Sequence, residues 1–106
     1  MSPAQTTTDP DASPLFELGD CRCTQLAMTF LTLWEVLVQA VLLRHVLGDW
    51  AELDAHDQEV NLQAVTTGAR ILSSYRYGDQ DVWVITEARG SDGRRHLTTV
   101  LLPEQY

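Results

Sequence analysis

The sequence predicts an α+β fold, in which two or three helices pack on one face of a three- to four-stranded antiparallel sheet. Apolar residues in the first part of the chain recur with the period of a helix. From Arg70 onward the apolar period shortens to two, and β-branched and aromatic residues become frequent, as in strands. The later strands are joined by short connections, which force neighbours to run antiparallel. The expected order is β-α-α-β-β-β.

The domain organisation follows from length and composition. A chain of 106 residues with 44% apolar residues is the size of one globular domain. We expect a single α+β domain over residues 16–106. Residues 1–15 are rich in Thr, Pro, Asp and Ser, and we expect a disordered lead there. This stretch lacks the basic region and apolar core of a secretory signal, so we expect a cytoplasmic protein.

A first strand is expected within the sequence FELGDCRC, residues 16–23. Cys21 and Cys23 lie two residues apart, which is too strained for a routine disulfide, and two cysteines are too few for a zinc site by themselves. Three histidines are available to complete such a site: His45, His56 and His96. Two reduced, buried thiols in a cytosolic protein are the favoured interpretation, and no metal or cofactor is predicted.

The most apolar stretch of the chain, residues 26–47, is long enough to span a bilayer. Glu35 lies near its middle, and a carboxylate at bilayer depth costs on the order of 3 kcal/mol. We therefore predict no membrane span, but one buried helix or two shorter helices that meet near Trp34. A surface this apolar also leaves self-association as an open alternative.

The motif RHVLGDW, Arg44 to Trp50, predicts the end of this helical region. Gly48 readily adopts the left-handed conformation that closes helices, and a basic last turn suits the helix dipole. A second helix is expected over residues 54–68, with Asp54 as its N-cap. Its apolar face is expected at Leu53, Val60, Ala64 and Val65, with Gln58, Glu59, Asn61 and Gln63 mostly in water.

Three strands are expected after the helices, with the sequences RILSSYRY, VWVITEA and HLTTVLL. The residues GDQD, 78–81, link the first pair as a hairpin, and RGSDGRR, 89–95, forms a longer, exposed and basic loop. Ser73, Tyr75 and Tyr77 share one face of the first of these strands, which we expect to be solvated.

The motifs RHVLGDW, WVITEA and TTVLLPEQY at this spacing resemble a family of uncharacterised plasmid-related proteins. Proteins of this family are carried by plasmids, integrative elements and phages, so the resemblance implies a protein of a mobile genetic element. It implies no biochemical role. This chain has Ala51 where members usually have Gly, lacks their short Gly- and Pro-containing break in the first helical region, and carries the insertion RGSDGRRH in the last hairpin.

One interpretation of RHVLGDW is catalytic. His45 is then a general base oriented by Asp49, in a small hydrolase or nuclease. The supporting cations of this hypothesis are Arg44 and Arg70, and further polar residues are Asn61, Tyr75 and Thr86. The chain has no serine elbow, phosphate-binding loop or HExxH motif. We favour the other interpretation, in which the motif ends a helix and Trp50 fills a corner of the core.

Charge provides the main functional prediction. The chain has 15 acidic residues against 7 arginines and no lysine, for a net charge of −8, which disfavours direct binding to nucleic acid. Five acids gather within eleven residues: Asp49, Glu52, Asp54, Asp57 and Glu59. We expect this cluster to dock a protein partner with a basic surface, such as a host defence or nucleic-acid-handling protein.

Overall fold

The computed structural model describes residues 13–106, so most of the lead expected over residues 1–15 lies outside the described residues. The fold is α+β, and the described part contains these strands and α-helices: β1 Asp20–Cys23, α2 Gln25–Leu33, α3 Val38–Val46, α4 Ala55–Thr67, β2 Ile71–Tyr77, β3 Gln80–Thr86 and β4 Leu97–Leu101. A short 3-10 helix, η1 Pro103–Gln105, follows. The order is β-α-α-α-β-β-β, with one helix more than the six-element order expected from the sequence.

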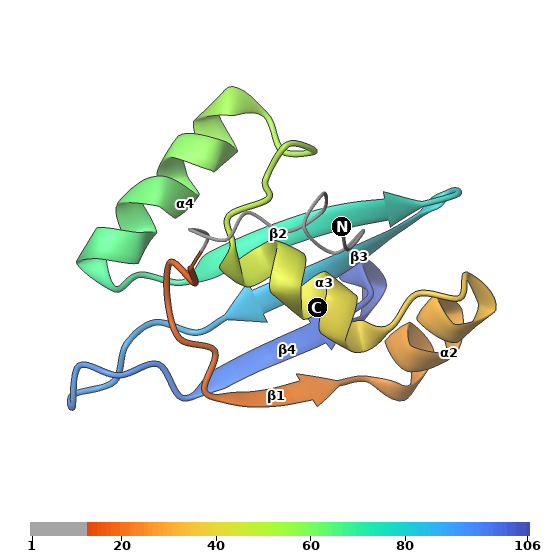
Figure 1. Cartoon of the computed structure of the whole chain (residues 1–106), viewed down its shortest axis with the longest axis horizontal. Helices are drawn as coiled ribbons and strands as arrows, with labels where there is room; N and C mark the ends of the chain where they lie inside the picture. Colours follow the sequence, from red (N-terminus) through yellow and green to blue (C-terminus); the bar gives the residue numbers. More distant parts are fainter. Residues whose placement is uncertain (1–12) are drawn as a thin grey trace, which may run out of the picture.

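The four strands form one sheet in the order β1-β4-β3-β2 (Figure 1). The pairs β2–β3 and β3–β4 are antiparallel, as their short connections predict. The prediction of a purely antiparallel sheet is wrong, because β1 pairs with β4 in parallel. All three helices and two strands separate β1 from β4 along the chain, so no tight turn sets their relative direction.

The apolar stretch 26–47 forms two helices, α2 and α3, which meet at an angle of 102°. The break follows Trp34, where Glu35 has a φ of 56° and the amide of Val36 returns to the carbonyl of Leu31. Among residues 13–106 no single helix is long and apolar enough to cross a membrane, although this bent pair would qualify by length and composition.

Helices α2 and α3 cover one face of the sheet and form the main core with it (Figure 1). Leu31 of α2 and Val41 of α3 are fully buried in this core. The strands contribute Tyr75, Val82, Val84 and Val100, all fully buried. The face that carries Ser73 and Tyr75 is therefore buried, not solvated as the sequence suggested, because the helices need an apolar surface to pack on.

Helix α4 lies beside the outer edge of β2 (Figure 1). The side chain of Asn61 donates to the carbonyl of Leu72 at 2.8 Å and accepts from its amide at 3.3 Å, so it satisfies the free edge of the strand. The expectation that Asn61 faces water is wrong, since its exposed fraction is 4%. Val60, predicted to be on the apolar face, is 46% exposed.

The loop after β3 is exposed over residues 89–94, as the sequence predicts, but Arg95 at its end is buried. Arg95 is 3% exposed, and its guanidinium donates to the carbonyls of Ala64, Ala69 and Glu87 at 2.8–3.0 Å. Arg89 donates to two further carbonyls at the end of α4. The last turn of α4 has no basic residue of its own, and this loop supplies the positive charge that its carbonyl end favours.

We predict that Arg95→Met lowers the free energy of unfolding by about 3 kcal/mol, because buried carbonyls lose a charged donor. Chemical denaturation followed by circular dichroism measures this change. Arg94→Met is the matched control, since the neighbouring Arg94 side chain is 71% exposed and makes only a long ion pair of 3.7 Å. Its effect should stay within about 0.5 kcal/mol. Equal effects for the two variants would contradict the capping role of Arg95.

Candidate functional site

The motif RHVLGDW ends α3 and turns the chain toward α4. Gly48 has a φ of 78°, and its amide donates to the carbonyl of His45 at 3.1 Å. The amide of Asp49 donates to the carbonyl of Arg44 at 2.9 Å, which completes the helix end. Trp50 is 7% exposed and packs in a second apolar cluster with Phe16 and other residues. The predicted helix stop is confirmed.

His45 lies in the core with an exposed fraction of 0%. Its Nδ1 lies 2.6 Å from Oγ of Ser73, and its Nε2 lies 2.8 Å from Oγ1 of Thr86. Trp50 Nε1 donates to the same serine oxygen at 3.0 Å. Thr86 in turn lies 2.7 Å from Thr98. The imidazole is thus one member of a buried chain of polar side chains.

The direction of these hydrogen bonds follows from donor counting. Thr98 Oγ1 donates its only proton to the carbonyl of Leu18 at 2.7 Å. Thr86 must then donate to Thr98, and His45 Nε2 must donate to Thr86. Nδ1 is left as an acceptor for the hydroxyl of Ser73. The network is complete with a neutral imidazole that carries its proton on Nε2.

Burial lowers the pKa of His45 to about 3, and the positive charge of Arg95 contributes to this shift. The ring of Phe16 packs edge-on against the imidazole, with the centroids 5.0 Å apart. A general base must exchange protons with a substrate, which requires access to that substrate. In this structure the imidazole of His45 has no such access.

Arg44 holds the first two acids of the predicted cluster. Its Nε contacts Asp49 at 2.6 Å, and its Nη2 contacts Glu52 at 3.1 Å. The guanidinium also lies over the ring of Tyr75, 4.1 Å from its centroid. The hydroxyl of Tyr75 donates to the carbonyl of Asp49, and burial raises the pKa of Tyr75 to about 12. Asp49 therefore binds Arg44 and does not orient His45.

Arg70, the remaining residue of the catalytic hypothesis, lies apart from His45. It is exposed just before β2 and donates to the hydroxyl of Tyr106. It lines a cleft of about 350 Å³, and neither His45 nor Asp49 is among the residues that line it. Of the further polar candidates, Asn61 and Thr86 are buried and already bonded within the fold. The structure does not bring the four proposed catalytic residues together.

The other three acids of the cluster face solvent on α4. Asp54 is the N-cap and accepts from the amide of Asp57 at 2.8 Å. Within residues 13–106, Asp54, Asp57 and Glu59 form no ion pair with arginine or histidine. Two clefts flank the helix. Asp57 lines the 350 Å³ cleft, and Glu59 lines a second cleft of about 400 Å³.

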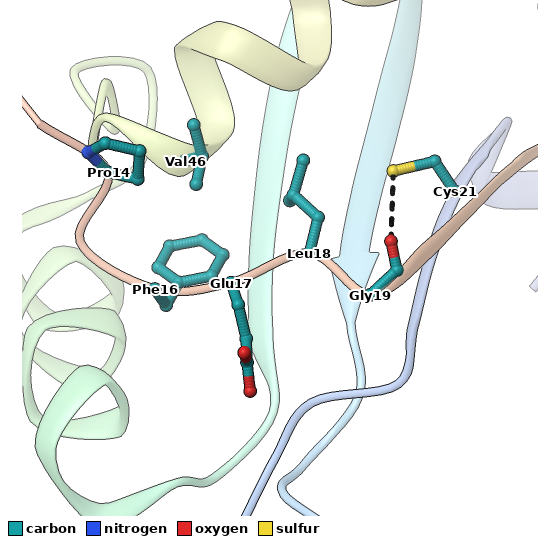
Figure 2. A pocket seen from close by; sticks show the side chains of 7 residues that line it. All are labelled: Pro14, Phe16, Glu17, Leu18, Gly19, Cys21 and Val46. Carbon is teal, nitrogen blue, oxygen red and sulfur yellow. Dashed lines mark hydrogen bonds between the residues drawn. The ribbon is translucent and has the colours of Figure 1, made fainter.

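A further cleft, of about 550 Å³, was not anticipated from the sequence (Figure 2). Figure 2 shows it along the segment that leads into β1, beside the end of α3. The residues that line it are Pro14, Phe16, Glu17, Leu18, Gly19, Cys21 and Val46. Most of this lining is apolar. The only sequence signal for it is the alternation of apolar residues before β1.

No metal centre is formed by the described residues, because no three His, Cys, Asp or Glu side chains gather as a metal ion requires. Cys21 and Cys23 are free thiols, but Cys21 is exposed and Cys23 is half-buried, so the prediction of two buried thiols is wrong. Partial burial raises the pKa of both thiols. Their thiols contact nearby backbone carbonyls.

No protein family model, curated protein or solved structure matches this chain. The function is therefore inferred from the geometry of the chain itself.

We predict that His45 makes the stability of the protein fall in mild acid. Its pKa is about 3 in the folded state against 6.5 in the unfolded state. The unfolded state therefore binds more protons below pH 6.5, and stability is lost as the pH falls from 6.5 toward 3. Between pH 7.5 and pH 5 the expected loss is about 2 kcal/mol. Denaturation at several pH values measures it.

The pH dependence is assigned to His45 by two variants. His45→Gln should be less stable at pH 7.5 and should lose most of the dependence between pH 7.5 and 5. His96→Gln removes an exposed histidine bound to Asp92 and should keep the dependence. A steep pH dependence in both variants would show that another group is responsible.

We also predict that diethyl pyrocarbonate modifies His56 and His96, which are exposed, and spares His45, which is buried. Peptide mass spectrometry of the native protein measures the extent of modification at each position. Modification of His45 at the rate of the other two would contradict the buried imidazole.

Proposed function

We propose that the protein is a non-catalytic macromolecule-binding protein whose helix α4 docks a basic surface of a protein partner. The main supporting observation is that most arginines are bound within the fold, whereas the acids of α4 are not. Five arginines, Arg44, Arg76, Arg89, Arg94 and Arg95, bind carboxylates or backbone carbonyls within the fold. The α4 acids Asp54, Asp57 and Glu59 bind none of them.

The shape of the α4 surface supports a basic partner with long side chains. In one cleft Glu59 lies beside the apolar residues Leu62 and Trp50, and in the other Asp57 lies beside Val60 and Trp83. Lysine and arginine have aliphatic stems that pack on apolar surface, with a charged head that pairs with an acid. The cleft at Glu59 combines these two features without a cation in its lining, whereas the cleft at Asp57 is also lined by Arg70, whose positive charge opposes a basic head group.

The revised docking surface is smaller than the predicted cluster. Asp49 and Glu52 are bound to Arg44, so they contribute less free negative charge than the sequence suggested. We keep Asp54, Asp57 and Glu59 as its centre. The resemblance to plasmid-related proteins supports a cytoplasmic setting in a mobile genetic element, with a host defence or nucleic-acid-handling protein as the partner class.

The alternative function, a hydrolase or nuclease with His45 as general base, needs a different conformation. The core would have to open between α3 and the sheet to give a substrate access to the imidazole. Arg44 and Asp49, which pair with each other, would also have to release each other. No observation in the described part favours this alternative over binding.

We predict that the triple variant Asp54→Asn, Asp57→Asn, Glu59→Gln loses its partner in pull-downs from lysate of the host cell. It should also bind an arginine-rich peptide about tenfold more weakly in titration calorimetry at low salt. Asparagine caps helices as well as aspartate does, so the variant removes charge without removing the N-cap. The affinity of the unaltered protein should fall as salt is added.

The matched control is the triple variant Asp79→Asn, Glu87→Gln, Glu104→Gln. It removes the same charge from exposed positions outside α4. This variant should retain the partner and most of the peptide affinity. The proposal fails if both triple variants lose binding equally, because net charge alone would then explain it, or if neither loses binding.

A further inference from the structure

The outer edge of β1 is open. β4 pairs with one side of β1, and no described element lies beyond its other side (Figure 1). The opposite edge of the sheet differs, because Asn61 binds both backbone groups of Leu72 there. Within β1, Asp20, Cys21 and Arg22 are exposed. An open edge presents unpaired backbone groups on which another strand can pair.

The parallel ladder determines which backbone groups are free. The amides of Asp20 and Thr24 donate to carbonyls on the β4 side, at 2.9 and 3.0 Å. Because backbone groups alternate along a strand, the amides and carbonyls of Cys21 and Cys23 point away from β4. A strand that adds to this edge would therefore form its hydrogen bonds with Cys21 and Cys23.

The side chains of β1 carry a charge pattern that is complementary to itself. Asp20 and Arg22 are two residues apart, so they share the face opposite to Cys21, which lines the cleft beside Val46 of α3. Arg22 makes no ion pair with any residue of the described part. We propose that β1 pairs antiparallel with β1 of a second copy of this chain, around a two-fold axis at Cys21.

Charge selects the register of this pairing. A two-fold axis at Cys21 places Asp20 of each copy opposite Arg22 of the other, which gives two reciprocal ion pairs. An axis at Arg22 would oppose two arginines, and an axis at Asp20 would oppose two aspartates. In antiparallel strands opposite charges face to face stabilise the pair, and like charges destabilise it. The axis at Cys21 also lets the free amide and carbonyl of that residue bond to those of the second copy.

The apolar cleft beside β1 adds buried surface to this interface. Phe16, Leu18 and Val46 line it together with Cys21, and Leu18 and Val46 also line a neighbouring cleft with Leu42. With the axis at Cys21 the helical layers of both copies lie on the same side of the joined sheet. The second copy then covers the open side of the cleft. This added burial matters, because a pair of four-residue strands alone would not hold the dimer together.

The test is the mass of the full chain over a range of concentrations, by light scattering and sedimentation equilibrium. The unaltered protein should dimerise. Arg22→Asp and Asp20→Arg each oppose like charges, and each should raise the dissociation constant about tenfold or more. The double variant Asp20→Arg, Arg22→Asp restores opposite charges in the same register and should recover most of the dimer. Recovery by the double variant is not expected from a purely structural effect of either residue.

Cross-linking tests the register itself. A short bismaleimide should join two copies through Cys21, so Cys21→Ser should abolish the cross-link and Cys23→Ser should retain it. Arg76→Asp, at an exposed arginine on β2 at the opposite edge of the sheet, is the control and should leave the dimer unchanged. These variants lie outside α4, so this proposal and the proposed function fail independently.

Two results would overturn the proposal. A protein that stays monomeric at all concentrations would show that the edge of β1 does not pair with a second copy. A second such result is a dimer that is unaffected by the β1 charges but dissociates in the variant Leu37→Ser, Leu43→Ser. It would place the interface on the exposed apolar side chains of α3 and its N-cap, within the apolar stretch where the sequence suggested self-association.

Discussion

The buried hydrogen-bond chain through His45 is the constraint on which the rest of the structure depends. It joins the end of α3 to β2 through Ser73, to β3 through Thr86, and from there to Thr98 on β4. It ends on the carbonyl of Leu18, in the segment that leads into β1. Each member donates to the next, so removing one leaves a buried polar group unsatisfied, at a cost of about 1–3 kcal/mol. Apolar packing alone would permit the helical layer to shift over the sheet, but directed hydrogen bonds at several strands allow one position.

This constraint also decides where chemistry can occur. A histidine that is neutral, buried and bonded at both nitrogens holds the layers together, and cannot serve a substrate from the same position. The arginines are used in a similar way, since Arg95 and Arg89 bind the carbonyl end of α4 and Arg44 binds the acids next to α3. These three arginines thereby bind groups of the fold, whereas the acids of α4 stay in solvent. The acidic surface of α4 is therefore a consequence of how the core and helix ends are satisfied.

The sequence predicted those features that depend on neighbouring residues. The helix stop at Gly48, the N-cap at Asp54 and the antiparallel order of the last strands all follow from local rules, and the structure confirms them. Features that depend on distant partners were missed. Asn61 and Arg95 are polar, so a pattern of apolar periodicity assigns them to solvent, yet each is buried because its partners lie elsewhere in the chain. The parallel pairing of β1 was missed for the same reason, since no short turn connects it to β4.

The two proposed binding surfaces lie at opposite edges of the sheet, and this separation has a physical consequence. α4 covers the edge at β2, and β1 forms the edge that remains open. A dimer joined through β1 would therefore leave α4 accessible on both copies, with the two acidic helices at the far ends of one continuous sheet. A partner with repeated basic surfaces could then engage both helices, and the second contact would form at the high effective concentration that a rigid link provides. Because Asp20 and Arg22 would pair with each other across the dimer axis, dimerisation would leave the acids of α4 free for that partner. Weak, salt-sensitive contacts at each helix would in this way give a tighter combined interaction without any additional contact surface on the single chain.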